Sequence, residues 1–438
     1  MDQSLRYEID RNEPEIKTIQ DFSDNEGILK LAEKCNGSGD CRKLNFAGGT
    51  MCPSYRATLD EKDTTRGRAN VLREFLTQNT KANPFDHPEI KEAMDLCISC
   101  KGCKSECPSN IDMATLKAEF QFQYHKNKSR SLRDKLIANN AKLNKLTSKF
   151  PKIHNVLINQ KWFKSGLRIS TKRSLPKLHN QTLRKWFHSF EQHSKPKKVY
   201  LFCDEYTNYY DVEIGKKAIL LLNKLGYEVL MIEHEESGRA YISKGFLKKA
   251  KRIANTNVNL FKNLVSEDIP LIGIEPSAIL SFRDEYINLV DDKFRSEASE
   301  LSKFVFLIDE FLANEIEAKH ITSDMFIKES KQIMLHGHCH QKALSSTKYT
   351  KSILSLPLNF IVSEIPSGCC GMAGSFGYEK EHYELSQKIG NQVLFPSVKK
   401  ANSNTILVAN GTSCRHQILD GVAKVVKHPV EILYDALL

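Results

Sequence analysis

The densest cysteine group of the chain lies between residues 97 and 108. Its spacing is C-x2-C-x2-C-x3-C followed by proline, and its members are Cys97, Cys100, Cys103 and Cys107. Runs of this kind hold cubane iron–sulfur clusters, because three closely spaced thiolates bind three corners of one cube while the cysteine before proline reaches a different cluster. The run therefore predicts a second cysteine group and a second cluster.

The second group lies upstream, at Cys35, Cys41 and Cys52, and Cys52 is again followed by proline. Exchange of the fourth ligands, as in two-cluster ferredoxins, predicts two ligand sets. The first set is Cys52, Cys97, Cys100 and Cys103, and the second set is Cys35, Cys41 and Cys107. The second set is one thiolate short, because Ser38 stands where the middle cysteine belongs. We expect it to hold either a 3Fe-4S cluster or a 4Fe-4S cluster with serine, water or another fourth ligand.

A third group occurs in the last part of the chain and consists of Cys339, Cys369, Cys370 and Cys414. Each follows a predicted strand or lies on a Gly-rich turn where backbone can approach a metal closely. We expect these four thiols to bind a third iron–sulfur cluster or a zinc ion. Four histidines crowd the same strand ends, where they are either ligands, hydrogen-bond donors to the ligands, proton carriers or ordinary surface residues: His336, His338, His340 and His416.

Zinc is also the alternative for the first two sets, since four-cysteine spacings form closed tetrahedral sites. Zinc sites pair two C-x2-C knuckles, however, whereas a triple run that ends in Cys-Pro is typical of clusters. A disulfide framework fits less well, because it is small secreted domains that need such cross-links and this chain has 438 residues.

The elements that position these cysteines fall into four predicted parts. Residues 1–124 form a helical two-cluster ferredoxin domain, and residues 125–196 form a basic helical linker. Short apolar strands then alternate with helices, which predicts α/β structure in residues 197–330 and 331–438. The predicted fold class is thus α plus α/β. Within the first part, Asp63 to Arg68 begins a helix in which Arg66 and Arg68 either face a cluster or are solvated.

The two α/β parts repeat one another. Val199 to Cys203 matches Gln332 to Cys339, and Glu236-Ser237-Gly238 matches Cys369-Cys370-Gly371. The third match is Glu275 to Ala278 with Gly411 to Cys414. A pseudo-twofold pair of repeats explains these matches most simply. The first repeat keeps Cys203 alone, so we expect a metal-free scaffold in which Cys203 either approaches the third site or is a buried strand-end residue.

The basic character of the chain belongs to the linker. The whole chain carries a net charge of +11, and residues 123–198 hold 20 Lys and Arg against two acids, a local charge of +18. Aromatic residues accompany the charge at Lys161-Trp-Phe-Lys164 and Arg184-Lys-Trp-Phe187. This pattern predicts contact with a membrane surface or an acidic partner, or else a linker with a solvated basic face. Nucleic acid is not an expected partner, because no reading motif accompanies the charge.

Several of these motifs resemble a known family. His338-Cys-His-Gln341, Cys369-Cys-Gly-Met-Ala-Gly374 and Thr412-Ser-Cys-Arg-His-Gln417 resemble the cysteine-rich CCG repeats of glycolate oxidase iron-sulfur subunits and of the CCG-bearing subunit of heterodisulfide reductase. Cys35-Asn-Gly-Ser-Gly-Asp-Cys41 and Thr65-Arg-Gly-Arg68 resemble the C-terminal iron–sulfur region of FAD-linked oxidases of the D-lactate and D-2-hydroxyglutarate dehydrogenase type. The likeness covers nearly the whole chain. Met1 to Tyr7 resembles the join after the flavin domain of that family.

The resemblance implies an iron–sulfur electron-transfer subunit or domain that passes electrons from the flavin of a 2-hydroxy-acid dehydrogenase to a quinone-type acceptor. FAD is then expected only on a partner, and the chain is not expected to be active without it. Relatives have a flavin domain and a further cysteine where this chain has Gln417, and many carry cysteines in the first repeat. The alternatives are a catalytic subunit like heterodisulfide reductase, or a zinc-stabilised scaffold. We expect a cytoplasmic protein, either free or held at the inner membrane face.

Overall fold

The computed structural model describes residues 13–438, with Phe46 described by its backbone alone. The motif at Met1 to Tyr7 lies outside the described residues. The remaining chain combines helices with two parallel sheets, which confirms the mixed helix and sheet class.

The N-terminal part is helical and carries the first two cysteine groups on its loops. Its helices are α1 (Ile28–Glu33), α2 (Pro53–Thr58), α3 (Thr65–Thr77), α4 (Pro88–Asp95), α5 (Gly102–Glu106) and α6 (Met113–Tyr124). The expected helix after Asp63 begins at Thr65, because the Thr64 hydroxyl accepts the Gly67 N–H at 2.8 Å and so caps the first turn. Asp112 caps α6 in the same way through the N–H groups of Ala114 and Thr115.

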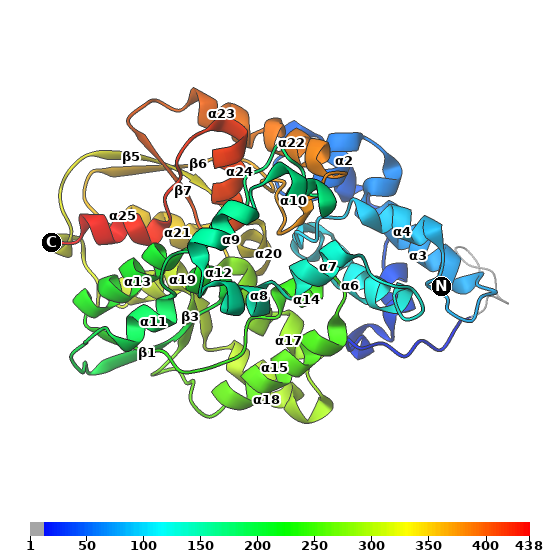
Figure 1. Cartoon of the computed structure of the whole chain (residues 1–438), viewed down its shortest axis with the longest axis horizontal. Helices are drawn as coiled ribbons and strands as arrows, with labels where there is room; N and C mark the ends of the chain where they lie inside the picture. The colour runs from blue at the N-terminus through cyan, green and yellow to red at the C-terminus, as the bar shows by residue number, and fades with distance from the viewer. Residues whose placement is uncertain (1–12) are drawn as a thin grey trace.

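A layer of short helices follows, in the segment predicted as the linker. These are α7 (Leu132–Ala138), α8 (Asn140–Thr147), α9 (Pro151–Leu157), α10 (Lys161–Gly166) and α11 (Leu183–His188). Figure 1 shows α7 to α10 crossing the middle of the molecule, between the helical part and the sheets near the C-terminus. The linker is therefore packed against the rest of the chain and is not an extended tether.

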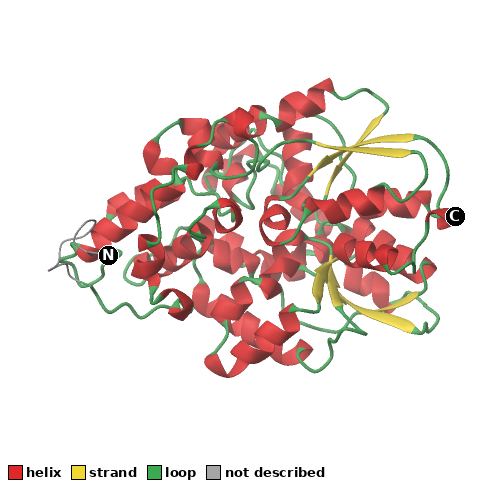
Figure 2. Ribbon diagram, turned by 180° about the vertical axis from the view of Figure 1, so that it is seen from behind, coloured by secondary structure: helices red, strands yellow, loops and turns green. Residues whose placement is uncertain are grey.

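Two parallel sheets occupy the end of the molecule that carries the C-terminus (Figure 2). The first has the order β2-β1-β3-β4 and the second β6-β5-β7. The strands are β1 (Lys197–Phe202), β2 (Tyr227–Leu230), β3 (Leu271–Gly273), β4 (Val305–Leu307), β5 (Lys331–His336), β6 (Phe360–Glu364) and β7 (Thr405–Ala409). The strand that opens each half is thus flanked by the second and third strands of that half, so the order β2-β1-β3 has the same form as β6-β5-β7.

Helices surround both sheets. Those of the first half are α12 (Glu205–Tyr209), α13 (Val212–Lys224), α14 (Arg239–Ser243), α15 (Leu247–Phe261), α16 (Pro276–Ile279), α17 (Glu285–Leu289), α18 (Arg295–Ser302) and α19 (Ile308–Glu317). Those of the second half are α20 (Cys339–Leu344), α21 (Thr347–Leu354), α22 (Tyr383–Gln392), α23 (Leu394–Lys400), α24 (Thr412–Val422) and α25 (Pro429–Ala436). One hydrophobic core includes Leu201 and Ile219 of the first half and Ile333 and Leu433 of the second, so the two halves share apolar packing.

A buried charge network holds the helical part against the first half. Lys101 has only 1 % of its surface exposed and pairs with Asp112 at 3.1 Å, with Glu285 at 3.3 Å and with Asp284. Glu285 in turn pairs with Arg239 of α14. Burial opposes the charge on Lys101, but the carboxylates of Asp112, Asp284 and Glu285 outweigh it and raise the pKa of its ammonium well above the usual value. These charges fix the loop that carries Cys100 and Cys103.

Candidate iron–sulfur centres

The first predicted ligand set surrounds one small cavity. Cys52, Cys97, Cys100 and Cys103 all line it, and each has at most 9 % of its surface exposed. Cys52 is the residue before α2, Cys97 and Cys100 lie on the loop before α5, and Cys103 lies in the first turn of α5. Burial raises the pKa of the Cys100 and Cys103 thiols. Four inward thiols around one space suit a metal cluster, which supplies the positive charge that stabilises thiolates.

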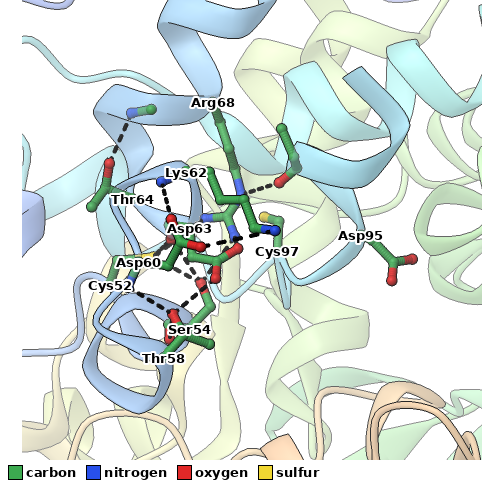
Figure 3. Close-up of polar contacts among 12 residues, drawn as sticks. Cys52, Ser54, Thr58, Asp60, Lys62, Asp63, Thr64, Arg68, Asp95 and Cys97 are labelled. Atoms are coloured by element: carbon green, nitrogen blue, oxygen red, sulfur yellow. Dashed lines mark hydrogen bonds and ion pairs between the residues drawn. The ribbon is translucent and has the colours of Figure 1, made fainter. Parts of the chain in front are cut away.

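Arg68 lines this cavity, so of the two expectations for the arginines of α3 it is the cluster-facing one that holds for this residue. Figure 3 shows Arg68 close to Cys52 and Cys97. Its Nη1 lies 3.5 Å from the Cys52 sulfur, and the guanidinium also donates to the carbonyls of Asp63 and Ala93. Burial opposes its charge, but Cys97, Cys52 and Asp63 raise the pKa of the guanidinium. Arg66 behaves differently, because it pairs with Glu61 at 2.7 Å and is partly exposed. A fixed cation beside Cys52 favours extra negative charge in the cavity.

The second predicted set is placed closer to the surface. Cys35 and Cys107 are partly exposed and Cys41 is buried, and all three belong to the hydrophobic cluster that also contains Cys52 and Cys103. Burial raises the pKa of the Cys41 thiol, while hydrogen bonds from the Arg66 backbone and the Thr64 side chain oppose that shift. Ser38 is exposed, and its N–H donates to the Asn36 side chain at 3.0 Å. Its role as a ligand stays a prediction.

The third predicted set is brought together at the ends of β5, β6 and β7. Cys339, Cys369, Cys370 and Cys414 are all buried and belong to one cluster of side chains. A hydrogen bond from Cys369 lowers the pKa of Cys339 to about 7, and the thiols of Cys369 and Cys414, with His336, lower the pKa of Cys370. The loop N–H groups of Gly371 and Met372 point at the sulfurs of Cys369 and Cys370, at 3.4 and 3.5 Å. The same hydrogen bonds raise the pKa of the Cys369 and Cys414 thiols, so the set combines two thiols that ionise readily with two that donate to them.

His336 joins the third set as a further donor. One of its ring nitrogens and the sulfurs of Cys370 and Cys414 lie within 4.8 Å of one another. Its Nδ1 is 2.7 Å from the Ser367 hydroxyl, whereas its Nε2 has no hydrogen-bond partner among the described residues although it is buried. Burial lowers the pKa of His336, which keeps the imidazole neutral as metal binding needs. Three or four thiols with one imidazole fit zinc as well as an iron–sulfur cluster.

The other histidines have separate positions. His338 caps α20, where its Nδ1 accepts the His340 N–H at 3.2 Å. His340 Nε2 lies 3.0 Å from the Ser99 carbonyl, so it joins the third site to the loop of the first set. His416 is not within the group that gathers around Cys370 and Cys414. Cys203 likewise lies apart from that group, in the apolar core that the two halves share, where burial raises the pKa of its thiol to about 12.

The first and third sites are neighbours. Cys100 and Ile98 belong to the same buried cluster as Cys339, Cys369 and Cys370. The Gly49 carbonyl and the Thr50 Cα lie so near Gly368 that a Cβ there would meet them at 3.0 and 3.2 Å. The loop before Cys52 and the loop before Cys369 are therefore in direct contact. Sequence spacing does not reveal this contact, because it joins loops more than 300 residues apart.

The cysteine geometry agrees with the comparisons with known proteins. A family model described as a 4Fe-4S dicluster domain matches residues 34–112, the segment that carries the first two sets. Residues 34–112 are thus similar to a 4Fe-4S dicluster domain. This confirms iron–sulfur clusters as cofactors of the helical part, and it leaves the metal of the third site as a prediction.

Three curated relatives extend the similarity to the rest of the chain. A D-2-hydroxyglutarate dehydrogenase of Escherichia coli (strain K12) is 28% identical over an alignment that covers 93% of this chain and 44% of the relative. One of the subunits of the anaerobic glycerol-3-phosphate dehydrogenase of the same strain is 28% identical over 62% of this chain and 68% of its own length. A probable glycolate oxidase iron-sulfur subunit of Bacillus subtilis (strain 168) is 22% identical over 94% of both chains.

These relatives confirm the resemblance to oxidoreductases and their iron–sulfur subunits. The chain spans less than half the length of the D-2-hydroxyglutarate dehydrogenases that it matches. Among the described helices, none is long and apolar enough to cross a bilayer.

Proposed function

We propose that this chain is the electron-transfer component of a flavoprotein dehydrogenase and carries electrons to a quinone-type acceptor. The observation that carries the proposal is the contact between the first cysteine site and the third, made by His340 with Ser99 and by the loops around Gly49 and Gly368. Such contact suits a series of one-electron carriers. The ligands would be the eleven cysteines of the three sets, and the clusters would supply reversible one-electron chemistry.

The positions of the sets favour one direction of electron flow. The set of Cys35, Cys41 and Cys107 lies nearest the surface, and the set around Cys52 lies between it and the third site. Electrons would enter at the exposed set from the flavin of the partner and leave near the first and third sites. The partner would oxidise a 2-hydroxy acid, because two relatives are named for substrates of this class, D-2-hydroxyglutarate and glycolate.

The domain organisation is proposed on the same basis. Residues 1–124 would be the ferredoxin-type domain, 125–196 the linker, and 197–330 with 331–438 two CCG-type repeats related by a pseudo-twofold axis. The matching orders β2-β1-β3 and β6-β5-β7 support the repeats, and so do the starts of β1 at Lys197 and β5 at Lys331. Cytoplasmic localisation, with the linker at a membrane surface, completes the proposal.

The membrane contact rests on α8 to α10. Apolar side chains are exposed there by 44 to 67 % of their surface: Leu146, Phe150, Ile153, Val156, Leu157 and Trp162. Exposed lysines alternate with them, namely Lys145, Lys149, Lys152 and Lys161, and none of the four pairs with a carboxylate of residues 13–438. Apolar groups among unpaired cations suit an anionic lipid surface.

The structure corrects the residues on which this contact was expected to rest. Lys164 is buried and donates to the Arg173 carbonyl at 2.6 Å, and Arg184 is held by the Ile232 carbonyl. Trp186 and Phe187 pack against the hydrophobic core that the two halves share. The second basic-aromatic motif therefore faces the protein, because its aromatic rings cover apolar side chains of the core.

The experiment that tests the electron-transfer proposal uses the full chain purified without oxygen. We expect iron and acid-labile sulfide, and we expect the visible cluster absorption to bleach when a 2-hydroxy acid and its flavoprotein dehydrogenase are added together. The chain alone with the acid should show no bleaching. Stoichiometric zinc without sulfide would contradict the proposal. Ser38→Cys should give a stable 4Fe-4S signal at the second set if Ser38 occupies a ligand position.

Liposome flotation tests the membrane contact separately. Replacement of Lys145, Lys149, Lys152 and Lys161 by Gln should weaken binding to vesicles that contain phosphatidylglycerol, since each cation near such a surface contributes about 1 kcal/mol. The matched control replaces four exposed lysines outside the linker: Lys319, Lys399, Lys400 and Lys424. If both variants bind the vesicles equally well, the basic face of the linker is a solvated surface and not a membrane-binding one.

A further inference from the structure

A large cavity lies beneath the linker helices and reaches the cysteine sites. Its volume is about 340 Å³, which is within the range of small-molecule sites. Cys339, Cys369 and Cys370 form part of its wall, and Ile98 and Ser99 line both this cavity and the one enclosed by the first cysteine set. A molecule in this cavity would therefore contact the third site and the loop of the first site together.

One side of the cavity is apolar and comes from the linker. Its side chains belong to α7, α8, α10 and the turns beside them: Leu136, Ile137, Leu143, Ile158, Phe163 and Leu167. They lie on the inner surface of the helical layer whose outer surface exposes Phe150, Ile153 and Trp162. The layer therefore presents apolar side chains both to the cavity and to the proposed lipid surface.

The opposite side of the cavity is polar and lies next to the cysteines. Tyr206 lines it, and within residues 13–438 no hydrogen bond is made by its hydroxyl. His338 also lines it, and because its Nδ1 accepts the His340 N–H, its Nε2 is the ring nitrogen that can donate. That Nε2 is 3.9 Å from the Glu275 carboxylate, beyond hydrogen-bond distance. Two donors are thus available at the end of the cavity nearest the redox sites.

We infer that this cavity binds the electron acceptor, a quinone whose ring carbonyls meet Tyr206 and His338 and whose apolar chain lies along the linker helices. The inference rests on the proposed function, since it assigns a place to the acceptor named there. A quinone has carbonyl acceptors at one end and hydrocarbon at the other, which is the same division of polarity as in the cavity. The cavity also lies directly under the layer through which a lipid-dissolved molecule would arrive.

The chemistry at this site balances without a further reactant. The quinone takes up two electrons and two protons and becomes a quinol. The reduced flavoprotein of the proposed function would supply the electrons, the metal clusters held by the cysteines would pass them on one at a time, and the protons would come from water. The contact of the cavity with the loop of the first set means that the route does not depend on which metal the third site holds.

Calorimetric titration of the anaerobic holoprotein with decylubiquinone tests the inference. We expect saturable binding at one site, and Ile137→Trp on the inner surface of α7 should weaken it by about tenfold or more, because the larger ring fills the cavity. Leu132→Trp is the matched control on the outer surface of the same helix, where Leu132 is 63 % exposed, and it should bind as the wild type does. Iron and sulfide contents are measured for each variant to verify the fold.

Two more titrations separate ring recognition from simple filling of apolar space. Tyr206→Phe should weaken decylubiquinone binding by roughly fivefold, which corresponds to one lost hydrogen bond. Decanol, which has the chain without the ring, should bind far more weakly than decylubiquinone. Equal effects of Ile137→Trp and Leu132→Trp, or equal affinity for decanol, would overturn the inference. If the flavoprotein bleaches the clusters but decylubiquinone does not bind, the acceptor site is refuted and electron transfer from the flavoprotein stands. If decylubiquinone binds but the flavoprotein does not bleach the clusters, the site stands and the proposed electron transfer is refuted.

Discussion

The two α/β halves share a strand order and differ in the chemistry at their strand ends. Gly238 and Gly371, which the sequence matches place at the same point, both have a positive φ, at +72° and +91°. The residues before them differ: Cys369 and Cys370 in the second half, and Glu236 and Ser237 in the first. Both glycines thus adopt a positive φ, while the side chains before them are soft thiols in the second half and hard oxygens in the first.

The polar side chains at the strand ends of the first half hydrogen-bond to one another. Glu205 accepts from the N–H of Ser237 at 2.9 Å and from its hydroxyl at 2.6 Å. Burial raises the pKa of Asp204 and of Glu236 to about 8, so both carboxyls are largely neutral below that pH. The strand ends of the first half therefore hold buried carboxyls and a hydroxyl where those of the second half hold thiols.

The largest expected effect is on metal content. Cys370→Ala should remove the metal of the second half, because Cys370 lies between Cys369, Cys414 and His336. Ser237→Ala, at the matching position of the first half, should leave metal content unchanged. Iron, zinc and sulfide per chain, measured by elemental and colorimetric analysis, test both variants. The same metal loss in both would mean that the first half also holds a metal.

Restoring thiols to the first half should have the next largest effect. The triple variant Glu236→Cys, Ser237→Cys and Ala278→Cys would complete a four-thiol set with Cys203. We expect it to bind about one further zinc ion, since four thiolates form a closed tetrahedral site. Zinc titration with a chromophoric chelator measures the gain, and the single variant Ala278→Cys is the control. No gain in a folded triple variant would show that the two strand-end frames are not equivalent.

The carboxylates of the first half should give a pH-dependent effect of intermediate size. The pKa of Glu236 is raised in the folded chain, so its contribution to stability is complete below its ordinary pKa and is lost as pH rises toward about 8. Glu236→Gln should be more stable than the wild type at pH 8 by on the order of 2 kcal/mol, with little difference at pH 5. Glu235→Gln is the control, because Glu235 pairs with Arg252 at the surface. Chemical denaturation at both pH values measures the change.

The smallest expected effect concerns a histidine of the second half. His382 lies 3.0 Å from Glu379 and 3.0 Å from Asp95, and these carboxylates raise its pKa although burial opposes the shift. Its contribution is therefore complete below about pH 6.5 and is lost as pH rises through the raised pKa. His382→Gln should lower stability by about 1 kcal/mol at pH 6 and by less at pH 9. A constant loss from pH 6 to pH 9 in denaturation experiments would contradict this sign.

The grouping of the cysteines could be predicted from the sequence because cluster ligands are defined by local spacing. Cys97, Cys100 and Cys103 need only a tight turn to meet at one cavity, and the return of Cys52 follows from the same two-cluster pattern. The parallel sheets were also predictable, since short apolar strands alternate with helices after residue 197. The matching of the strand ends then indicated where Cys339 and Cys414 would lie.

The contacts between distant segments could not be predicted in this way. Lysine and tryptophan residues of the linker have the same appearance in the sequence whether they face lipid or core, and only packing shows that Trp186 turns inward while Trp162 is exposed. Nothing in the spacing of His336 distinguishes it from His416, because the choice depends on how β5 and α24 meet. The cavity beneath the linker likewise arises from segments that are remote in the sequence.

The burial of Lys101 affects whether the chain can be divided. Its ammonium is shared between Asp112 of the helical part and Asp284 and Glu285 of the first α/β half, with 1 % of its surface exposed. Separation of the parts would take Lys101 away from Asp284 and Glu285 while it kept Asp112, and breaking a buried pair costs about 3–5 kcal/mol. We therefore expect that the helical part cannot be fused alone to another dehydrogenase without loss of stability. Any hybrid enzyme made from this chain has to move the cysteine loops together with the acidic loop at residues 284–285.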